Sequence, residues 1–271
     1  MPFSCGTLFG TFGMATGEGG KAMRLEGKVA LITGGTRGIG AATAVVLAEK
    51  GADVAIVGRH DDEDTKQTKA SVEAFGRRCP VIIADVGRPD EATRCVEETA
   101  LRLGPIDVLI HSAGGGVPGG LLEVSPEVWY DAFNVHVHAI YYLCRASIPM
   151  MQKKKEGAVV LVSSVAGLRG VPFATAYQVV KGAVPQFARA LAREFADDNI
   201  RVNAVVPGII RTRFHAGMSS EQRKHNIDNR IPLHREGTPQ QVARLIAELV
   251  ANDYITGESI AVDGGLTMRI A

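Results

Sequence analysis

Seven short apolar runs, separated by longer segments with helical spacing, constrain the fold of this chain more than any other feature. The runs are nearly continuous in apolar residues, which is typical of strands buried on both faces of a parallel sheet. They lie at residues 29–33, 54–57, 81–84, 108–112, 159–163, 202–206 and 259–263. Between them, helices are expected near residues 38–51, 61–76, 89–103, 126–153, 175–196 and 239–252.

This alternation of strands and helices predicts one doubly wound α/β sheet of the Rossmann type. No repeat or break in composition divides residues 25–271, so we expect a single domain there. Residues 1–24 are rich in Gly, Thr and Phe without any period, and we expect a flexible tail. Residues 211–238 are polar and irregular, which indicates either a substrate lid or a solvated surface excursion.

Charge and cysteine content exclude several classes of function. With a net charge of +1 over 271 residues, nothing indicates binding to nucleic acid or to an anionic membrane. No apolar run approaches the length of a membrane span. The four cysteines are far apart and form no paired motif, so we expect no metal site, no disulfide and a cytoplasmic location.

A glycine-rich loop, "TGGTRGIG" at residues 33–40, follows the first run and opens into the first helix. Gly34, Gly38 and Gly40 allow a sharp turn and a close approach of the backbone to a pyrophosphate. The helix start adds free N–H groups and the positive end of the helix dipole. The loop therefore predicts a dinucleotide site, with a purely structural turn as the alternative.

The end of the second run indicates which dinucleotide is bound. NAD sites usually carry a carboxylate there, whereas this chain has Gly58 and Arg59, with Arg37 in the glycine loop. Two arginines suit the 2′-phosphate of NADP(H). Asp61 and Asp62 follow closely, and we expect them to cap the next helix, although their presence leaves NAD open.

A tyrosine–lysine pair in the helix near residues 175–196 suggests the chemistry. Tyr177 and Lys181 are four residues apart and share a helix face, so the cation is expected to lower the phenol pKa from about 10. Ser164 directly follows the fifth run, at the carboxyl end of a strand where parallel sheets bind ligands. We predict that Tyr177 donates a proton and Ser164 polarises a carbonyl oxygen during hydride transfer. The alternative is a chance surface pair.

Taken in order, the motifs resemble those of the short-chain dehydrogenase/reductase family from about Leu25 to Ile270. The matching segments are "TGGTRGIG", "DV" at 85–86, "HSAGG" at 111–115, "SSVAG" at 163–167, "YQVVK" at 177–181, "PGIIRT" at 207–212 and "VDGG" at 262–265. The resemblance implies a strand order of 3-2-1-4-5-6-7. It also implies a homotetramer or dimer built largely through the two long helices.

The resemblance also implies which residues bind the cofactor NADP(H). They are Gly34, Thr36, Arg37, Gly38 and Ile39 in the glycine loop, Arg59 after the second strand, Asp85 and Val86 at the adenine, Ala113 and Gly114 near the ribose, and Pro207, Gly208, Ile210 and Thr212 toward the carboxamide. Tyr177 and Lys181 complete the set, since the lysine would hold the nicotinamide ribose as well as tune the tyrosine.

His136 departs from the family pattern, because relatives have an asparagine at this helix position. In relatives its main-chain carbonyl holds a water of the proton relay. A neutral imidazole is both donor and acceptor, so His136 either joins the relay or is a satisfied buried histidine. His111 and Ser112 replace two family asparagines, and Pro185 predicts a tolerated kink after Lys181.

Within the family, the chain looks most like the 3-oxoacyl-acyl-carrier-protein reductases. We therefore expect an NADPH-dependent carbonyl reductase whose substrate is a small or carrier-bound carbonyl compound, with a 3-oxoacyl thioester as the first candidate. A sugar, polyol or secondary alcohol dehydrogenase is the alternative within the class. A non-catalytic dinucleotide-binding sensor is the alternative outside it.

Overall fold

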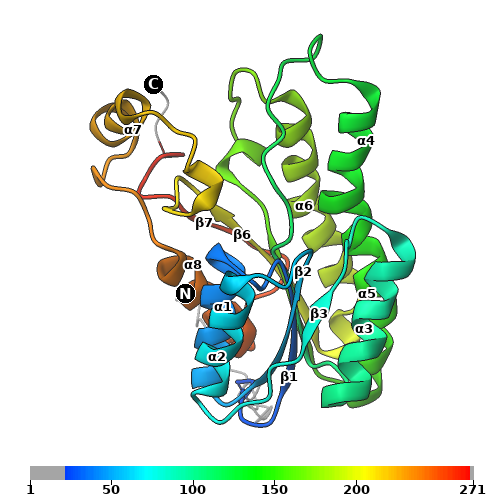
Figure 1. Ribbon diagram of the computed structural model, residues 1–271. Helices are drawn as coiled ribbons and strands as arrows, with labels where there is room; N and C mark the ends of the chain where they lie inside the picture. Colours follow the sequence, from blue (N-terminus) through cyan, green and yellow to red (C-terminus); the bar gives the residue numbers. More distant parts are fainter. Residues whose placement is uncertain (1–21, 269–271) are drawn as a thin grey trace, which may run out of the picture.

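A parallel sheet forms the centre of the computed structural model, which describes residues 22–268 (Figure 1). Its strand order within these residues is β3-β2-β1-β4-β5-β6-β7, which confirms the predicted topology. The strands are β1 (Val29–Thr33), β2 (Asp53–Gly58), β3 (Val81–Ile83), β4 (Val108–His111), β5 (Gly157–Val162), β6 (Ile200–Pro207) and β7 (Ser259–Val262).

Successive residues of each central strand enter different layers of the core, because side chains alternate across a sheet. Leu31 and Leu109 pack in the layer under one set of helices, whereas Ile32 and Ile110 pack in the layer under the other. In register, Ile32 of β1 lies beside Ile110 of β4. Both faces are thus buried, which explains why the runs are continuous in apolar residues.

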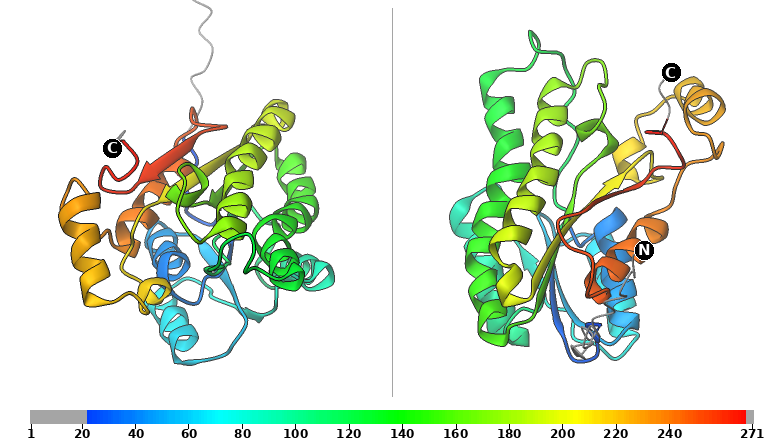
Figure 2. Two further views of the ribbon diagram at one scale, coloured as in Figure 1. Left: turned by 90° about the horizontal axis from the view of Figure 1, so that it is seen from above. Right: turned by 180° about the vertical axis from the view of Figure 1, so that it is seen from behind.

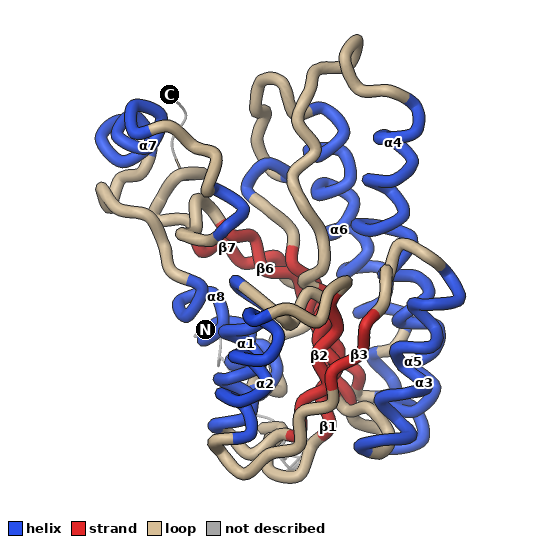
Figure 3. The backbone as a smooth tube through the Cα atoms, in the orientation of Figure 1, coloured by secondary structure: helices blue, strands red, loops and turns tan. Residues whose placement is uncertain are grey.

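Helices cover both faces of the sheet (Figure 3). On one side lie α1, α2 and α8, and on the other lie α3, α5 and α6; Figure 2 shows the two layers from above and from behind. The bounds of these helices and of α4, which precedes α5, are α1 (Gly38–Glu49), α2 (Glu63–Glu73), α3 (Pro89–Leu103), α4 (Pro126–Phe133), α5 (Ala139–Lys154), α6 (Thr175–Glu194) and α8 (Pro239–Ala251). Because the strands are parallel, their carboxyl ends lie at the same edge of the sheet. The loops that lead from each strand into the following helix lie at that edge.

The helix predicted over residues 126–153 is interrupted. A five-residue π-helix, η1 (Asn134–His138), separates α4 from α5 and contains His136. Such π-turns are rare and are often found at functional sites. Farther along, α6 remains helical through the buried Pro185, so this proline does not end the helix.

Met23 packs into the core of the domain. Met23 is 5% exposed, and its backbone N–H donates to the carbonyl of Ala251 at 2.9 Å. Met23, which falls within the predicted tail of residues 1–24, thus belongs to the same core layer as Leu47 and Val54. The remainder of the predicted tail, residues 1–21, lies outside the described residues.

Residues 211–238, called the lid below, contain three short helical segments. They are η4 (Arg213–His215), α7 (Ser220–His225) and η5 (Asn226–Arg230). The lid stands above α1 and α8 and is drawn in yellow to orange in Figures 1 and 2. We expected irregular chain here, but Ser219 and Gln222 form a capping box that starts α7.

Cys79, Cys95 and Cys144 are buried and free, while Cys5 lies outside the described residues. Burial raises the pKa of each of the three thiols to about 12, so they remain protonated at neutral pH. Between residues 22 and 268, no helix is long and apolar enough to cross a bilayer. In the same range, no group of histidine, cysteine and acidic side chains is arranged to hold a metal ion.

Candidate active site

The glycine loop lies against the chain that follows β4. Gly34 has φ +64°, and a Cβ atom at this position would come within 2.8 Å of the Ala113 backbone. Helix α1 begins at Gly38, and the preceding Arg37 provides no side-chain cap. The first N–H groups of α1 therefore stay available, and this uncapped helix start with its close-packed loop fits a dinucleotide pyrophosphate.

The other predicted cofactor residues lie at the same edge of the sheet, because each follows the carboxyl end of a strand. Asp85 follows β3, and its carboxylate accepts a hydrogen bond from the N–H of Gly87 at 3.0 Å. Val86 is buried. The remaining members are Thr36 and Ile39 in the glycine loop, Ala113 and Gly114 after β4, and Pro207, Gly208, Ile210 and Thr212 at the end of β6 and beyond.

Arginines and aspartates meet where β2 ends. Arg37 Nη2 lies 2.5 Å from Asp62 Oδ2, and Arg37 Nε lies 3.8 Å from Asp64 Oδ2. Asp62 caps α2 by accepting from the Thr65 N–H at 3.1 Å, as predicted, whereas Asp61 makes no such cap. Among residues 22–268, Arg59 is exposed and makes no ion pair, so its guanidinium is available to a ligand.

The tyrosine, lysine and serine come from two elements that meet at this edge. Tyr177 and Lys181 lie in the first turns of α6, and Ser164 is the second residue after β5. Lys181 is 7% exposed, its Nζ donates to the carbonyl of Val162 at 2.9 Å, and it lies 5.9 Å from the centroid of the Tyr177 ring. The Ser163 hydroxyl donates to the Lys181 carbonyl at 2.7 Å, which fixes α6 against the end of β5.

The predicted direction of the Tyr177 pKa was wrong. Burial raises the pKa of Tyr177, and a hydrogen bond with Ser164 offsets part of that rise. Lys181 Nζ donates its hydrogen bond to the Val162 carbonyl rather than to Tyr177, and burial lowers the pKa of Lys181 itself to about 8. Spacing on a helix face reveals which side chains are neighbours, but burial decides their protonation.

His136 lies beside Tyr177, with the two rings edge to face and their centroids 5.9 Å apart. Its Nε2 is 3.1 Å from the Gly115 carbonyl, and because a carbonyl only accepts, Nε2 carries the proton. Burial and the nearby Lys181 charge lower the pKa of His136 to about 2, so the ring is neutral. Its Nδ1 is thus an acceptor, and it is buried without a partner among residues 22–268.

His111 is a second buried histidine, whose contacts the sequence did not reveal. Its Nδ1 accepts from the Thr33 hydroxyl at 2.9 Å, and its Nε2 donates to the Val135 carbonyl at 3.1 Å. Burial lowers the pKa of His111 to about 3. With both nitrogens satisfied, His111 connects β4 to β1 and to η1, and so positions the π-turn that carries His136.

Gly114 and His136 depend on each other sterically. A Cβ atom at Gly114 would lie 2.1 Å from Cε1 of His136, and Gly114 also has φ +145°. We expect Gly114→Ala to lower the free energy of unfolding by about 2 kcal/mol, because the ring cannot be accommodated without displacement. Urea denaturation of the purified variant measures this loss.

The matched control is Gly115→Ala, since a Cβ atom there would have no heavy atom within 4 Å. We expect this variant to unfold at nearly the same urea concentration as the parent. In a His136→Ala background, Gly114→Ala should lower the free energy of unfolding by less than it does in the parent. The difference between the two losses, which is the coupling energy, should be about 1 kcal/mol or more. Equal costs in both backgrounds would contradict the steric interpretation.

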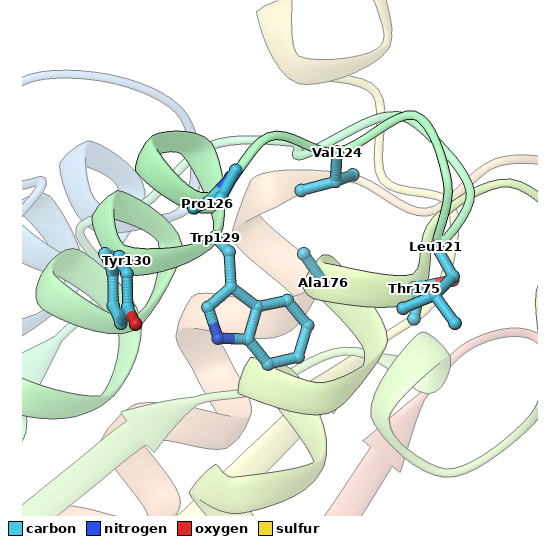
Figure 4. Close-up of a pocket in the computed structure, with 7 residues that line it drawn as sticks. All are labelled: Leu121, Val124, Pro126, Trp129, Tyr130, Thr175 and Ala176. Atoms are coloured by element: carbon cyan, nitrogen blue, oxygen red, sulfur yellow. The ribbon is translucent and has the colours of Figure 1, made fainter.

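An apolar pocket of about 250 Å³ lies beside the helix that carries Tyr177 (Figure 4). Its lining comes from the β4–α4 loop, from α4 and from the start of α6, namely Leu121, Val124, Pro126, Trp129, Tyr130, Thr175 and Ala176. Thr175 and Ala176 directly precede Tyr177 in the chain. None of the four candidate catalytic residues lines this pocket, so it adjoins the site without containing it.

A glycine-rich loop that opens a helix, with a half-buried tyrosine and serine and a buried lysine at the same edge of the sheet, is typical of an oxidoreductase that uses a nicotinamide dinucleotide. The family model described as enoyl-(acyl carrier protein) reductase matches residues 34–267. The chain belongs to the short-chain dehydrogenase/reductase family, whose members bind nicotinamide dinucleotides and act on carbonyl or alcohol groups.

Two curated relatives are described as 3-oxoacyl-[acyl-carrier-protein] reductases. The one from Thermotoga maritima is 36% identical over 248 residues, covering 91% of this chain and 100% of the relative. The one from Chlamydia muridarum is 35% identical over 244 residues, covering 89% and 98%. Among solved structures, L-sorbose reductase from Gluconobacter frateurii, complexed with NADPH and L-sorbose, matches with a TM-score of 0.85 at 28% identity, covering 92% of this chain and 100% of that one.

Proposed function

We propose that this protein is an NADPH-dependent carbonyl reductase that converts a 3-oxoacyl thioester on an acyl carrier protein into the 3-hydroxyacyl product. The observation that carries the proposal is the meeting of Ser164, Tyr177 and Lys181 at the carboxyl edge of the sheet, beside the glycine loop. The two relatives described as 3-oxoacyl-[acyl-carrier-protein] reductases support this substrate class.

In this proposal, bound NADPH supplies the hydride that the carbonyl carbon receives. Tyr177 is the proton donor to the carbonyl oxygen, and its raised pKa keeps the hydroxyl protonated before the reaction. Ser164 donates a hydrogen bond to the same oxygen, which stabilises the negative charge that develops there. The oxygen thus gains the proton as the carbon gains the hydride, and the product is an alcohol.

Lys181 and His136 then restore the proton on Tyr177. The Lys181 ammonium stabilises the phenolate that remains after proton transfer, because the ammonium is buried and lies 5.9 Å from the ring of the half-buried tyrosine. The unpaired Nδ1 of His136 is a hydrogen-bond acceptor beside the same ring. Buried polar atoms of this kind commonly bind an ordered water, and we assign such a water to the path that returns the proton.

The choice of NADPH rests on the cations at the end of β2. Arg37 and Arg59 would bind the 2′-phosphate, with Arg37 held in place by Asp62. That the related L-sorbose reductase is complexed with NADPH supports this choice. The same relative also favours the second candidate function, the reduction of a keto sugar or oxidation of a polyol.

Reduction of an acetoacetyl thioester, followed by the absorbance of the reduced nicotinamide, tests the proposal. We expect NADPH to be preferred over NADH by about tenfold or more in kcat/KM, because charged hydrogen bonds to the 2′-phosphate are absent with NADH. Arg59→Gln should lower that preference by about tenfold. Lys66→Gln, which removes an exposed cation of α2 without an ion pair in the described chain, is the control.

Equal or better turnover with NADH would overturn the assignment of the arginines. Turnover of L-sorbose or a polyol, without turnover of the thioester, would favour the second candidate. Carrier-bound thioester should be reduced at least as efficiently as the free acetoacetyl thioester if the carrier protein belongs to the substrate.

A further inference from the structure

An ion pair joins the lid to helix α2 across 149 residues of sequence. Arg213 Nη2 donates to Asp64 Oδ1 at 2.9 Å, and Arg213 Nη1 lies 2.6 Å from Asp64 Oδ2. Only the contact at Oδ1 is a hydrogen bond, whereas Oδ2 is buried without a hydrogen-bond partner among residues 22–268 and meets Arg213 by charge alone. Asp64 lies in the first turn of α2, whereas Arg213 begins η4 of the lid.

The ion pair lies next to the glycine loop. Asp64 Oδ2 is also 3.8 Å from Arg37 Nε, and Arg37 directly precedes α1. On the lid side, the methyl group of Thr212 would be 3.5 Å from a Cβ atom at Gly38, the first residue of α1. The start of η4 thus passes over the uncapped helix end that fits a pyrophosphate.

The residue after Arg213 contacts the catalytic side of the site. The rings of Phe214 and Tyr177 are 5.9 Å apart between centroids. The Phe214 ring would also lie 3.4 Å from a Cβ atom at Gly116, in the chain after β4. One turn, η4, therefore reaches both the nucleotide end and the reacting end of the site.

The lid is held together from within by a buried carboxylate. Glu236 is 4% exposed, and its Oε2 accepts from Arg211 Nε at 3.2 Å and from Arg223 Nη1 at 2.6 Å. The ion pair of Arg213, whose side chain is 69% exposed, is open to water and salt. Because salt screens an exposed pair, and Glu236 is held by two arginines whereas Asp64 holds the lid through Arg213, we expect the contact with Asp64 to open before those of Glu236.

We propose that Asp64 is a positioning residue that docks the lid onto α2 and thereby retains the bound dinucleotide. Its carboxylate holds Arg213, and η4 therefore lies over the glycine loop. The same position of η4 keeps the ring of Phe214 in contact with Tyr177. The inference depends on dinucleotide binding, which the family establishes, and not on the substrate assigned under the proposed function.

Asp64→Asn keeps the shape of the side chain but removes its charge. We expect the dissociation rate of NADPH to rise about two- to fivefold, which is the scale of an exposed ion pair. Arg213→Gln should give a similar increase, and the double variant should exceed neither single variant appreciably, because both remove the same contact. Glu63→Gln changes a neighbouring exposed carboxylate that has no ion pair within residues 22–268, and it should leave the rate unchanged.

Two measurements on the full-length protein test the proposal without requiring turnover. Stopped-flow displacement gives the dissociation rates of NADPH and NADH, and hydrogen exchange of residues 213–225 without nucleotide reports opening of the lid. Asp64→Asn and Arg213→Gln should both accelerate that exchange. Raising the salt concentration should accelerate dissociation from the parent more than from either variant.

Either of two results would overturn the proposal. In the first, Asp64→Asn matches Glu63→Gln in both lid exchange and dissociation. In the second, the effects of Asp64→Asn and Arg213→Gln on dissociation add fully, so that Asp64 acts through Arg37 rather than through the lid. If the thioester is not a substrate but these measurements behave as expected, the docking role stands while the proposed function fails.

Discussion

A Tyr177→Phe variant is expected to lose about 10³-fold in kcat while binding NADPH with nearly unchanged affinity. The substitution removes only the hydroxyl that donates the proton. The phenyl ring keeps its edge-to-face contact with His136 and its contact with Phe214, so the walls of the site are retained. Steady-state kinetics and titration of nucleotide fluorescence give the two quantities separately.

Tyr142→Phe is the matched control, since Tyr142 lies half-buried in α5 and its hydroxyl has no hydrogen bond among residues 22–268. It should retain the parent turnover. If Tyr177→Phe kept more than about a tenth of the activity, another group would be the proton donor. A parent protein that binds nucleotide but turns over no carbonyl or alcohol would instead support the sensor interpretation.

The parallel α/β sheet could be predicted because continuous apolar runs identify strands buried on both faces. The order of the strands came from the resemblance to the family, since nothing local to a run says which strand lies beside it. The predicted ends of the strands were less accurate than the predicted strands themselves. The fifth strand begins at Gly157 rather than at residue 159, because Gly157 and Ala158 pair with Ile200 and Arg201 of β6 despite the low strand propensity of glycine and alanine.

Features that depend on tertiary contacts could not be predicted. The π-turn at His136 lies within a segment whose apolar spacing continues without interruption, so the sequence predicted one helix. The Tyr177 pKa follows from burial, which spacing within α6 does not give. The pairing of Asp64 with Arg213 has no local signature at all, whereas the capping box at Ser219 was present in the sequence and would have predicted α7.

The free energy of unfolding is expected to fall steeply as the pH drops below about 6.5, because His111 and His136 are buried as neutral rings. Unfolded histidine has a pKa of about 6.5. The pKa values of about 3 for His111 and about 2 for His136 in the folded protein lie below it. Between these limits only the unfolded chain takes up protons, so the stability present above about pH 6.5 is lost as the pH falls.

Below about pH 6.5, each histidine should lower the free energy of unfolding by about 1.4 kcal/mol per pH unit. At about pH 5 the loss is therefore about 2 kcal/mol for each histidine. Urea denaturation at several pH values gives the slope of the free energy of unfolding against pH. His136→Asn should remove nearly half of the part of that slope that comes from His111 and His136. This slope reports proton uptake alone, so it does not depend on how the substitution changes the overall stability. His225→Asn, which alters an exposed histidine of α7, is the control and should leave the slope unchanged.

The same experiment tests the chemistry assigned to His136. Its Nδ1 can accept a hydrogen bond from a relay water only while the ring is neutral, and a folded pKa far below 6.5 guarantees that state throughout the neutral range. If the parent and His136→Asn lost stability with the same slope, the ring would take up its proton in the folded protein as readily as in the unfolded one. His136 would then be a cation beside Lys181 under mildly acidic conditions, and it could not return the proton to Tyr177 as an acceptor.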